Sequence, residues 1–450
     1  MFRTLSLAVC SVMLTACTLA PEYNRPEMAV PHSMPQGAAY TEVYTEYNEQ
    51  SLELANFVKD ERLAEVIDMA VNSNRSLRSQ IAAIEEARAA YRITRADLLP
   101  SIGGTGSAGR GDNGITGPTD SYSLSVGLNT FEIDLFGKTR SLKDAALERY
   151  LAAESTVQAA KISLIGETIN VWITLAADKE QLKLSEETMK SAFNSVELTR
   201  SRYEAGISSK LDLLQAETIY YQTKADVASN TTLVAQDLNA LTLLVGESID
   251  ESLLPNGFEG SEQWLGMPSS GLSSEVLLRR PDIAAAEHTL KAANANIGAA
   301  RAAFFPSISL TGSAGYSSSN LSDLFDGNIW SFAGVINLPI FTGGANKANL
   351  DASWAALDGY LATYDYTIQA AFKEVADTLA RRGTIDAQIE AQAELFRVSE
   401  ESYALAENRY TLGLDTYINM LESQRTYYNA ERALISMHMV ELSNRVALYK

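Results

Sequence analysis

The sequence reads RAAFFPSI at residues 301–308 and RADLLPSI at residues 95–102, an offset of 206 residues. A second echo lies further along each copy, where RYTLG at residues 409–413 repeats RYEAG at residues 202–206 at an offset of 207. Self-similarity at one long, fixed period indicates tandem structural repeats. The 450-residue chain is therefore predicted to consist of two halves, residues 57–255 and 256–450.

Each half has the same order of predicted elements. An Ala-rich helix ends at a proline, and two segments of alternating polar and apolar residues follow, which is typical of strands joined by a polar turn. A very long helix comes next, then a glycine turn and a returning helix. The predicted ranges in the first half are helix 77–98, strands 101–111 and 122–135, and helices 138–203 and 208–246; in the second half they are helix 282–304, strands 307–317 and 330–341, and helices 345–410 and 415–448.

The lengths of these elements predict the fold class. A helix of sixty-odd residues is about 100 Å long, more than a globular domain needs. The strands have about the 9–11 residues that a tilted membrane strand requires. Four strands are too few to close, since the smallest membrane barrels have about eight, and open strand edges cannot face lipid. The sequence therefore predicts a mixed α/β membrane protein in which several copies combine their strands.

Apolar side chains recur at helical spacing along the long helices. This spacing predicts faces buried in a core or in a coiled-coil seam. The positions are Ile165, Ile169, Trp172 and Leu175, then Met189, Phe193 and Val196, and near the end of the chain Ile435, Met439, Leu442, Val446 and Tyr449.

The first residues are typical of a bacterial secretory signal. A short basic region at residues 1–4 precedes an apolar stretch at residues 5–14, too short to span a membrane as a helix. The stretch runs into LTAC at residues 14–17, which resembles a lipobox, so we predict a signal peptide at residues 1–16 and a lipid (for example palmitate) on Cys17. Thr18 is not the aspartate that retains lipoproteins at the inner membrane, which favours the outer membrane. Residues 17–56 are Pro- and Tyr-rich and are expected to be mostly extended.

Composition argues against several classes of function. The formal net charge is -20, whereas nucleic-acid binding needs concentrated Lys and Arg. His32, His288 and His438 have no Cys or acidic partners at the spacing of metal ligands, and no nucleophile–base pair is recognisable. The sequence predicts no catalytic residue, no metal site and no cofactor apart from the lipid.

The chain resembles the TolC-like outer-membrane efflux family, and within it the lipoprotein branch typified by OprM and MtrE. The resemblance extends over the whole mature chain and both halves. The residues that carry it are RPDI at 280–283, AEH at 286–288, ANA at 293–295, IGAARAAFFPSISL at 297–310, LPIFTGG at 338–344, YRI at 91–93, ADL at 96–98 and EIDLFG at 132–137.

The resemblance implies a homotrimer. Three chains with four strands each would form a twelve-stranded transmembrane β-barrel, continued by a long periplasmic α-helical barrel. The glycine turns at Gly206 and Gly413 would lie at the periplasmic tip, where a membrane-fusion adaptor and an inner-membrane transporter dock. Such a protein is the passive exit duct of a tripartite efflux pump, and it is gated at that tip.

The resemblance also points to residues of the gate. Ile418, Asn419 and Glu422 correspond to the closed aperture, where three isoleucines would form an apolar constriction and three glutamates an anionic ring. Like charges held close in a pore attract cations. Asn419 replaces an aspartate of TolC, which weakens the expected field.

The contacts that hold such a gate closed are less well defined by the resemblance. Asp212 matches a gate-locking aspartate, but Asp415 stands where TolC has its locking arginine, so that ion pair cannot form. A pairing of Asp415 with Arg202 or Arg409 would replace it. The full set of candidates for these contacts is Asp212, Arg202, Tyr203, Arg409, Tyr410 and Asp415.

Two other functions remain open at this point. A channel of the same family could export heavy metals such as copper or silver, although the ten methionines form no cluster. A periplasmic adaptor or structural coiled coil without a channel is a second alternative. An adaptor would not need four amphipathic strands that end at polar turns.

Overall fold

The computed structural model describes residues 18–40, 53–112, 114, 117–267 and 273–450. The predicted signal peptide and Cys17 lie outside the described residues. The chain divides into two compact units: unit 1 contains residues 1–29, 81–157 and 278–368, and unit 2 contains residues 30–80, 158–277 and 369–450. Each unit takes segments from both sequence halves, because the long helices continue from one unit into the other.

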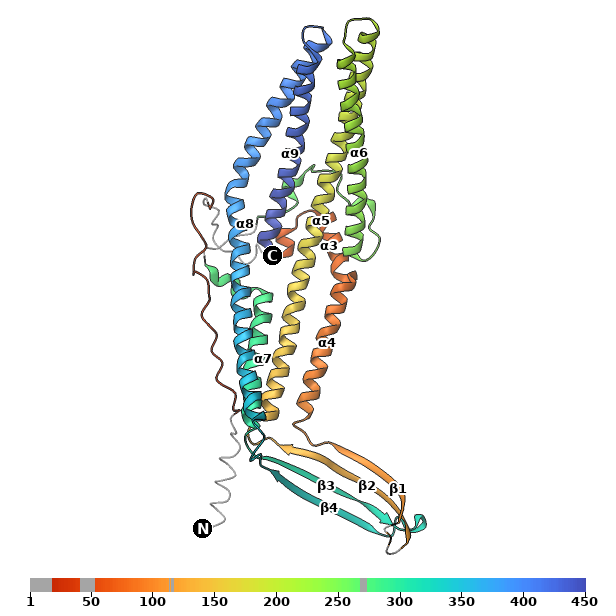
Figure 1. Ribbon diagram of the computed structural model, residues 1–450, viewed down its shortest axis with the longest axis vertical. Helices are drawn as coiled ribbons and strands as arrows, with labels where there is room; N and C mark the ends of the chain where they lie inside the picture. The colour runs from red at the N-terminus through yellow and green to blue at the C-terminus, as the bar shows by residue number, and fades with distance from the viewer. Residues whose placement is uncertain (1–17, 41–52, 113, 115–116, 268–272) are drawn as a thin grey trace. The chain divides into compact units, whose positions relative to one another are not determined.

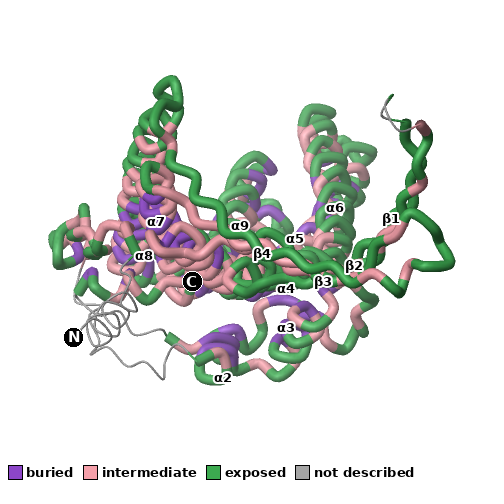
Figure 2. The backbone as a smooth tube through the Cα atoms, turned by 90° about the horizontal axis from the view of Figure 1, so that it is seen from below, coloured by how far each residue is buried: buried purple, intermediate pink, exposed green. Residues whose placement is uncertain are grey.

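Unit 1 contains a four-stranded antiparallel sheet with the strand order β1-β2-β3-β4 (Figure 1). The first half contributes β1 (Ile102–Asp112) and β2 (Pro118–Ile133), and the second half contributes β3 (Ser307–Ser318) and β4 (Asn328–Asn337). The two hairpins join through β2 and β3, where Leu124 is opposite Tyr316. The outer strands β1 and β4 are largely exposed (Figure 2).

The fourth strand is shorter than the sequence predicted. The expected range was 330–341, whereas β4 ends at Asn337. Pro339 follows two residues later, and a proline has no N–H with which to continue a ladder. The apolar residues after the strand, including Ile340 and Phe341, are highly exposed instead of paired in the sheet.

Two helices that end in unit 1 lead into the strand hairpins. Helix α4 (Arg75–Ala96) precedes β1, and α7 (Pro281–Ala302) precedes β3. Pro281 is the first residue of α7, where its fixed φ favours helix initiation. In contrast to α4, α7 buries many of its residues, and its alanines pack closely against Ala145 of α5 (Lys138–Glu204).

Unit 2 contains the ends of two helix hairpins. Helix α5 turns back into α6 (Lys210–Val245), and α8 (Ala345–Thr411) turns back into α9 (Tyr417–Tyr449). Helices α5 and α8 both have 67 residues, so the repeat extends to the length of these helices.

The core of unit 2 surrounds Trp172. The side chains of Ile165, Ile169 and Leu175 are buried with it, which confirms the first predicted stripe. The Trp172 indole donates a 3.1 Å hydrogen bond to the Leu253 carbonyl oxygen. A second contribution comes from α3 (Glu61–Ser73), which packs its apolar face into the same cluster, and from the end of α9, where Leu442 and Val446 are buried.

The second predicted stripe is only partly right. Val196 is buried, but Phe193 is 46% exposed and packs beside Tyr220 of α6. Phe193 therefore lies at the edge of the hairpin and not in its seam. Among the described helices, none is long and apolar enough to cross a membrane.

Candidate gate at the helix hairpin tips

Both hairpins turn in the same way. Gly206 and Gly413 have φ values of +75° and +73°, a backbone conformation that residues other than glycine rarely adopt. The residue after each glycine donates a 2.8 Å hydrogen bond five residues back, from Ile207 to the Arg202 carbonyl and from Leu414 to the Arg409 carbonyl. This is the Schellman pattern, which satisfies the last carbonyls of a helix. The two predicted tip turns are therefore structurally equivalent.

Asp212 begins α6. Its carboxylate accepts hydrogen bonds from the Ser209 backbone N–H and hydroxyl and from the Ser208 hydroxyl, while the Ser209 hydroxyl accepts from the Asp212 N–H. This is a capping box. Burial raises the pKa of Asp212, but the hydrogen bonds from Ser209 and Ser208 outweigh it and hold the pKa below the ordinary value. This geometry thus gives Asp212 a local role in starting its own helix.

Arg202 connects the first hairpin to the second. Its guanidinium donates to the carbonyl oxygens of Tyr410 and Thr411, at 3.0 and 2.8 Å, and lies over the Tyr410 ring. The alternative of an Arg202–Asp415 pair is not what the structure contains. Both acceptors lie in the last turn of α8, where the helix supplies no further N–H to its carbonyls. The Tyr410 carbonyl also accepts a 3.0 Å hydrogen bond from the Gly413 N–H of the turn.

Two hydroxyl pairs between α5 and α8 were missed by the sequence analysis. Tyr410 and Thr199 have their hydroxyl oxygens 3.0 Å apart, and so do Tyr403 and Ser191. Gln424 of α9 lies 3.4 Å from both partners of the second pair. The seven-residue spacing of the two tyrosines was a usable signal, because it places them on one face of α8.

The two copies of the repeated tyrosine differ. Tyr410 is buried, whereas Tyr203, its equivalent in the first half, is 41% exposed. Only the second copy therefore contributes its ring and its hydroxyl to the contact between hairpins. We name this contact, formed by Arg202, Thr199 and Tyr410, the tip latch.

Asp415 pairs with Arg409. Their side chains approach to 3.1 Å, and Asp415 also accepts from the Asn419 side chain at 2.7 Å and from the Thr416 N–H. These hydrogen bonds, the one from Asn419 foremost, keep the pKa of Asp415 below its ordinary value. The ion pair between Arg409, in the last turn of α8, and Asp415, before α9, thus spans Gly413 and stabilises the second turn.

The aperture candidates share one face of α9. Ile418, Asn419 and Glu422 are exposed, and Ile418 is 47% exposed. The opposite face of the same turns is buried against the first hairpin through Tyr417, Met420 and Leu421. The three candidates therefore lie on the solvent-exposed face of α9, whose opposite face packs against the first hairpin.

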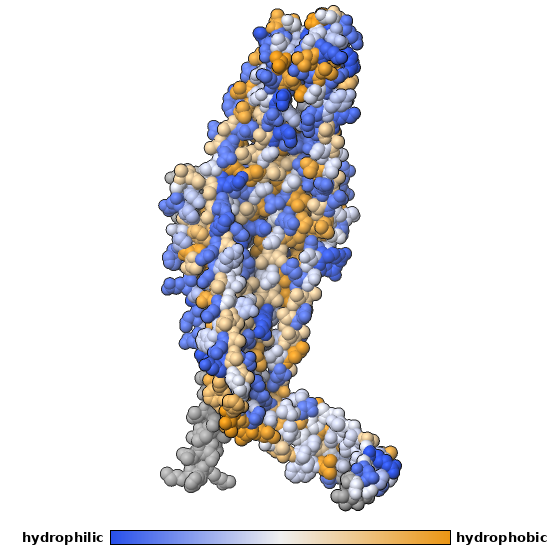
Figure 3. Space-filling model, in the orientation of Figure 1, coloured by the Kyte–Doolittle hydropathy of each residue, from blue (hydrophilic) through white to orange (hydrophobic). Residues whose placement is uncertain are grey.

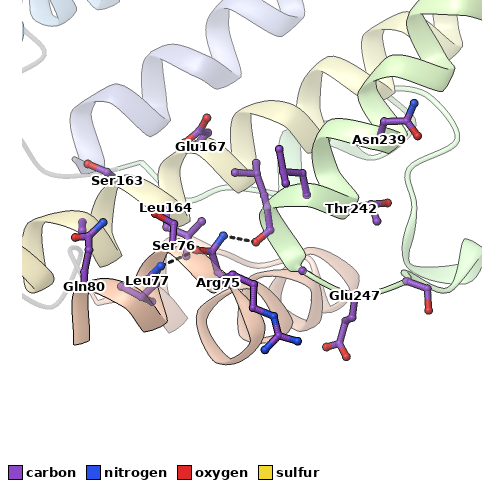
Figure 4. Close-up of a pocket in the computed structure, with 16 residues that line it drawn as sticks. Arg75, Ser76, Leu77, Gln80, Ser163, Leu164, Glu167, Asn239, Thr242 and Glu247 are labelled. Atoms are coloured by element: carbon purple, nitrogen blue, oxygen red, sulfur yellow. Dashed lines mark hydrogen bonds between the residues drawn. The ribbon is translucent and has the colours of Figure 1, made fainter. Parts of the chain in front are cut away.

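A cavity lies in another part of unit 2. It has a volume of about 930 Å³ and is bordered by the beginning of α4, the middle of α5 and the end of α6 (Figure 4). The Asn74 side chain accepts from the Leu77 N–H and donates to the Leu244 carbonyl beside it. The lining residues, all of them described, include no His or Cys. Over the described ranges, no cluster of three or more His, Cys, Asp or Glu could hold a metal ion.

Comparison with known proteins gives consistent matches. The family described as "Outer membrane efflux protein" matches residues 66–247 and 272–450. The toluene efflux pump outer membrane protein TtgC and the antibiotic efflux pump outer membrane protein ArpC, both of Pseudomonas putida, are each 42% identical to this chain over 99% of it and 94% of their own length. The open state of the MtrE outer membrane channel of Neisseria gonorrhoeae aligns with a TM-score of 0.86 and 35% identity over 96% of this chain and 97% of MtrE.

Proposed function

The chain belongs to the outer membrane efflux protein family, and from this we propose that it is the exit duct of a tripartite efflux pump for small apolar or amphipathic compounds. Such a duct conducts passively and performs no catalysis. The breadth of the cargo follows the names of the relatives, which include a toluene pump and an antibiotic pump.

The observation that carries the proposal is the one-sided exposure of α9 beyond the second turn. Ile418, Asn419 and Glu422 face away from the core of their own chain. Three copies around an axis would bring three such faces together and narrow the opening. Rings of apolar and acidic side chains are common means of gating and ion selection in pores.

The tip latch supports gating at this place. It joins two hairpins through one cation–π contact, two charge-assisted hydrogen bonds and one hydroxyl pair. Contacts of this kind are strong enough to hold a conformation and weak enough for a docking partner to break. Opening the duct would separate the second hairpin from the first.

The turns offer a surface for that partner. Apolar residues at both tips, Ile207 and Leu211 in the first hairpin and Leu412 and Leu414 in the second, are exposed to solvent. Figure 3 shows apolar atoms among the polar ones at the ends of both hairpins. We assign this surface to a periplasmic adaptor that connects the duct to an inner-membrane transporter.

The proposal includes the oligomeric state of the protein and its attachment to the membrane. The chain acts as a homotrimer whose twelve strands close into one barrel, because four strands per chain leave two open edges. The mature protein is attached to the outer membrane by its barrel and by a lipid on Cys17. Covalent lipid anchors hold a protein at a membrane less firmly than a spanning structure does, so the barrel is the stronger anchor.

The test is efflux from cells that lack this protein. Deletion should increase retention of an amphipathic dye and sensitivity to toluene, and a plasmid copy should reverse both. A plasmid that encodes the variant Leu211→Asp/Leu414→Asp tests the tip surface. This variant should assemble but should not restore efflux, because its hairpin tips no longer bind an apolar partner. Sensitivity to copper or silver alone would indicate metal export, and no change in any compound tested would contradict the duct.

A further inference from the structure

The described chain begins with an extended segment that lies along α7. We call residues Thr18–Arg25 the strap. The strap forms no helix or strand and belongs to unit 1 together with α7 (Figure 1).

Three residues of α7 bind the strap at intervals of seven. Arg301 donates to the Leu19 carbonyl at 3.1 Å, and Asn294 donates to the Pro21 carbonyl at 2.8 Å. Glu287 accepts two hydrogen bonds from Arg25, at 3.1 and 2.7 Å. Seven residues are about two helical turns, so these three side chains stand in one row. The row therefore binds two backbone carbonyls of the strap at one end and the Arg25 side chain at the other.

A glycine in this row permits close approach. A Cβ added to Gly298 would lie 2.7 Å from the Ala20 nitrogen, which is closer than real Cβ atoms come. Ser141 Oγ of α5 would lie 2.5 Å from the same Cβ, so Ala20 of the strap and Ser141 together occupy the space that a side chain would fill. At the equivalent positions of α4, 206 residues earlier, Arg92 replaces the glycine and Ile81 replaces Glu287. The first half therefore lacks this binding row.

Arg25 of the strap is one of two cations that pair with Glu287. The carboxylate is largely buried, and Lys291 is its second cation, at 3.0 Å. Burial raises the pKa of Glu287, but hydrogen bonds from Arg25 and then Lys291 outweigh it and lower the pKa. Tyr23 adds a ring beneath the Lys291 ammonium, 5.3 Å from its centre. Removing one partner of a buried ion pair destabilises a protein. Dissociation of Arg25 from Glu287 is therefore unfavourable, and the strap should stay bound to α7.

The other end of the strap reaches the junction of helices and sheet. Thr18 and Ser141 have their hydroxyl oxygens 3.1 Å apart, and Ser141 is in the first turn of α5. Arg301 is in the last turn of α7, six residues before the start of β3. The N-terminal end of the strap is therefore held beside this junction.

We propose that the row Glu287, Asn294, Gly298 and Arg301 is a peptide-binding groove, specific to the second half, that holds the strap and fixes where the N-terminus leaves the protein. Its ligand is an extended segment with free carbonyls and one arginine. With the strap bound in the groove, the chain N-terminal to Thr18 starts from a fixed position at the junction of helices and sheet. This inference goes beyond the proposed transport function and does not need it.

Disulfide trapping in the full-length protein tests the groove. In the variant Thr18→Cys/Ser141→Cys, thiols replace two oxygens that are 3.1 Å apart, so mild oxidation should link them. The matched control is Thr18→Cys/Ala348→Cys, because Ala348 of α8 is the exposed equivalent of Ser141 and should not link. Peptide masses identify the linked pair and separate it from any pair that involves Cys17.

The row itself is tested in the linking background. Asn294→Ala/Arg301→Ala should slow linking about tenfold, since both carbonyl contacts are lost. Arg88→Ala/Arg95→Ala removes the equivalent residues of α4 and should leave the rate unchanged.

Absence of a disulfide between positions 18 and 141 in the Thr18→Cys/Ser141→Cys variant would overturn the proposal. Equal slowing by the α4 and α7 pairs of substitutions would also overturn it. All readouts are chemical, so a failure of the efflux assay would leave this test unaffected.

Discussion

The guanidinium carbon of Arg202 lies 4.5 Å from the centre of the Tyr410 ring, and the same guanidinium donates a 3.0 Å hydrogen bond to the Tyr410 carbonyl oxygen. One residue of the first hairpin thus holds both the side chain and the backbone of one residue of the second. The contact is expected to contribute about 1–3 kcal/mol, less than a docking partner can supply.

Tyr410→Phe should loosen the tip latch. The substitution leaves the Thr199 hydroxyl buried without its partner, which costs about 1–3 kcal/mol. We expect more frequent opening and a larger mean conductance in planar bilayers. The control is Tyr203→Phe, which removes the exposed hydroxyl of the equivalent tyrosine and should change nothing. Equal conductance of all three proteins would remove Tyr410 from the gate.

Glu422→Gln should reduce the preference of the channel for cations. Removing three carboxylates from a narrow ring weakens its negative potential. We expect the reversal potential under a KCl gradient to move toward zero. Glu401→Gln changes an exposed glutamate of α8 that pairs with Arg397 and should leave the reversal potential in place. If both variants behave like the parent, Glu422 does not face the pore.

Asp237→Asn should make stability less dependent on pH. Burial, and then the nearby Asp178 carboxylate, raise the pKa of Asp237 to about 7 from 3.8. The folded protein therefore holds a proton that the unfolded chain releases. The stabilising contribution of this proton is complete below pH 3.8 and is lost as the pH rises through 7.

The measurement is thermal unfolding between pH 6 and pH 8. The parent should lose stability over this range, and Asp237→Asn should remove most of the loss, with a Tm at pH 8 raised by about 1–3 °C. Asp68→Asn, at an exposed position of α3, should retain the slope of the parent. An unchanged slope in Asp237→Asn would mean that the group does not titrate in this range.

Cys17→Ala should abolish labelling of the protein by radioactive palmitate. A lipobox cysteine is the acceptor of the acyl chains, and no other cysteine remains after the signal peptide is removed. The trimer should still form, because the strands and not the lipid make it. Cys10→Ala, within the predicted signal peptide, should label normally. Persistent labelling of the Cys17 variant would place the lipid elsewhere.

Much of the fold could be predicted because the relevant signals are local. Glycine at each tip determines where the long helices turn, and a proline determines where α4 and α7 stop, so these bounds differ from the structure by a few residues. The stripe around Trp172 was correct because its neighbours recur at strict helical spacing.

The contacts of the gate candidates were less predictable for a physical reason. The pair Thr199–Tyr410 depends on the axial register of two parallel helices, and packing over their whole length sets that register. The partners of Arg202 are backbone carbonyls, which every residue has and no sequence pattern marks. The helical spacing predicts a buried Phe193, but the side chain is 46% exposed, because spacing alone does not distinguish the seam of a helix hairpin from its edge.

The equal length of α5 and α8 limits how this protein can change by insertion or deletion. One residue added to α5 alone would turn all later residues of that helix by about 100° and shift them by about 1.5 Å. Thr199 would then no longer meet Tyr410. Tolerated changes of length should therefore come in pairs, one in each half and in steps of about seven residues, so that the two halves of the gene can lengthen or shorten only together.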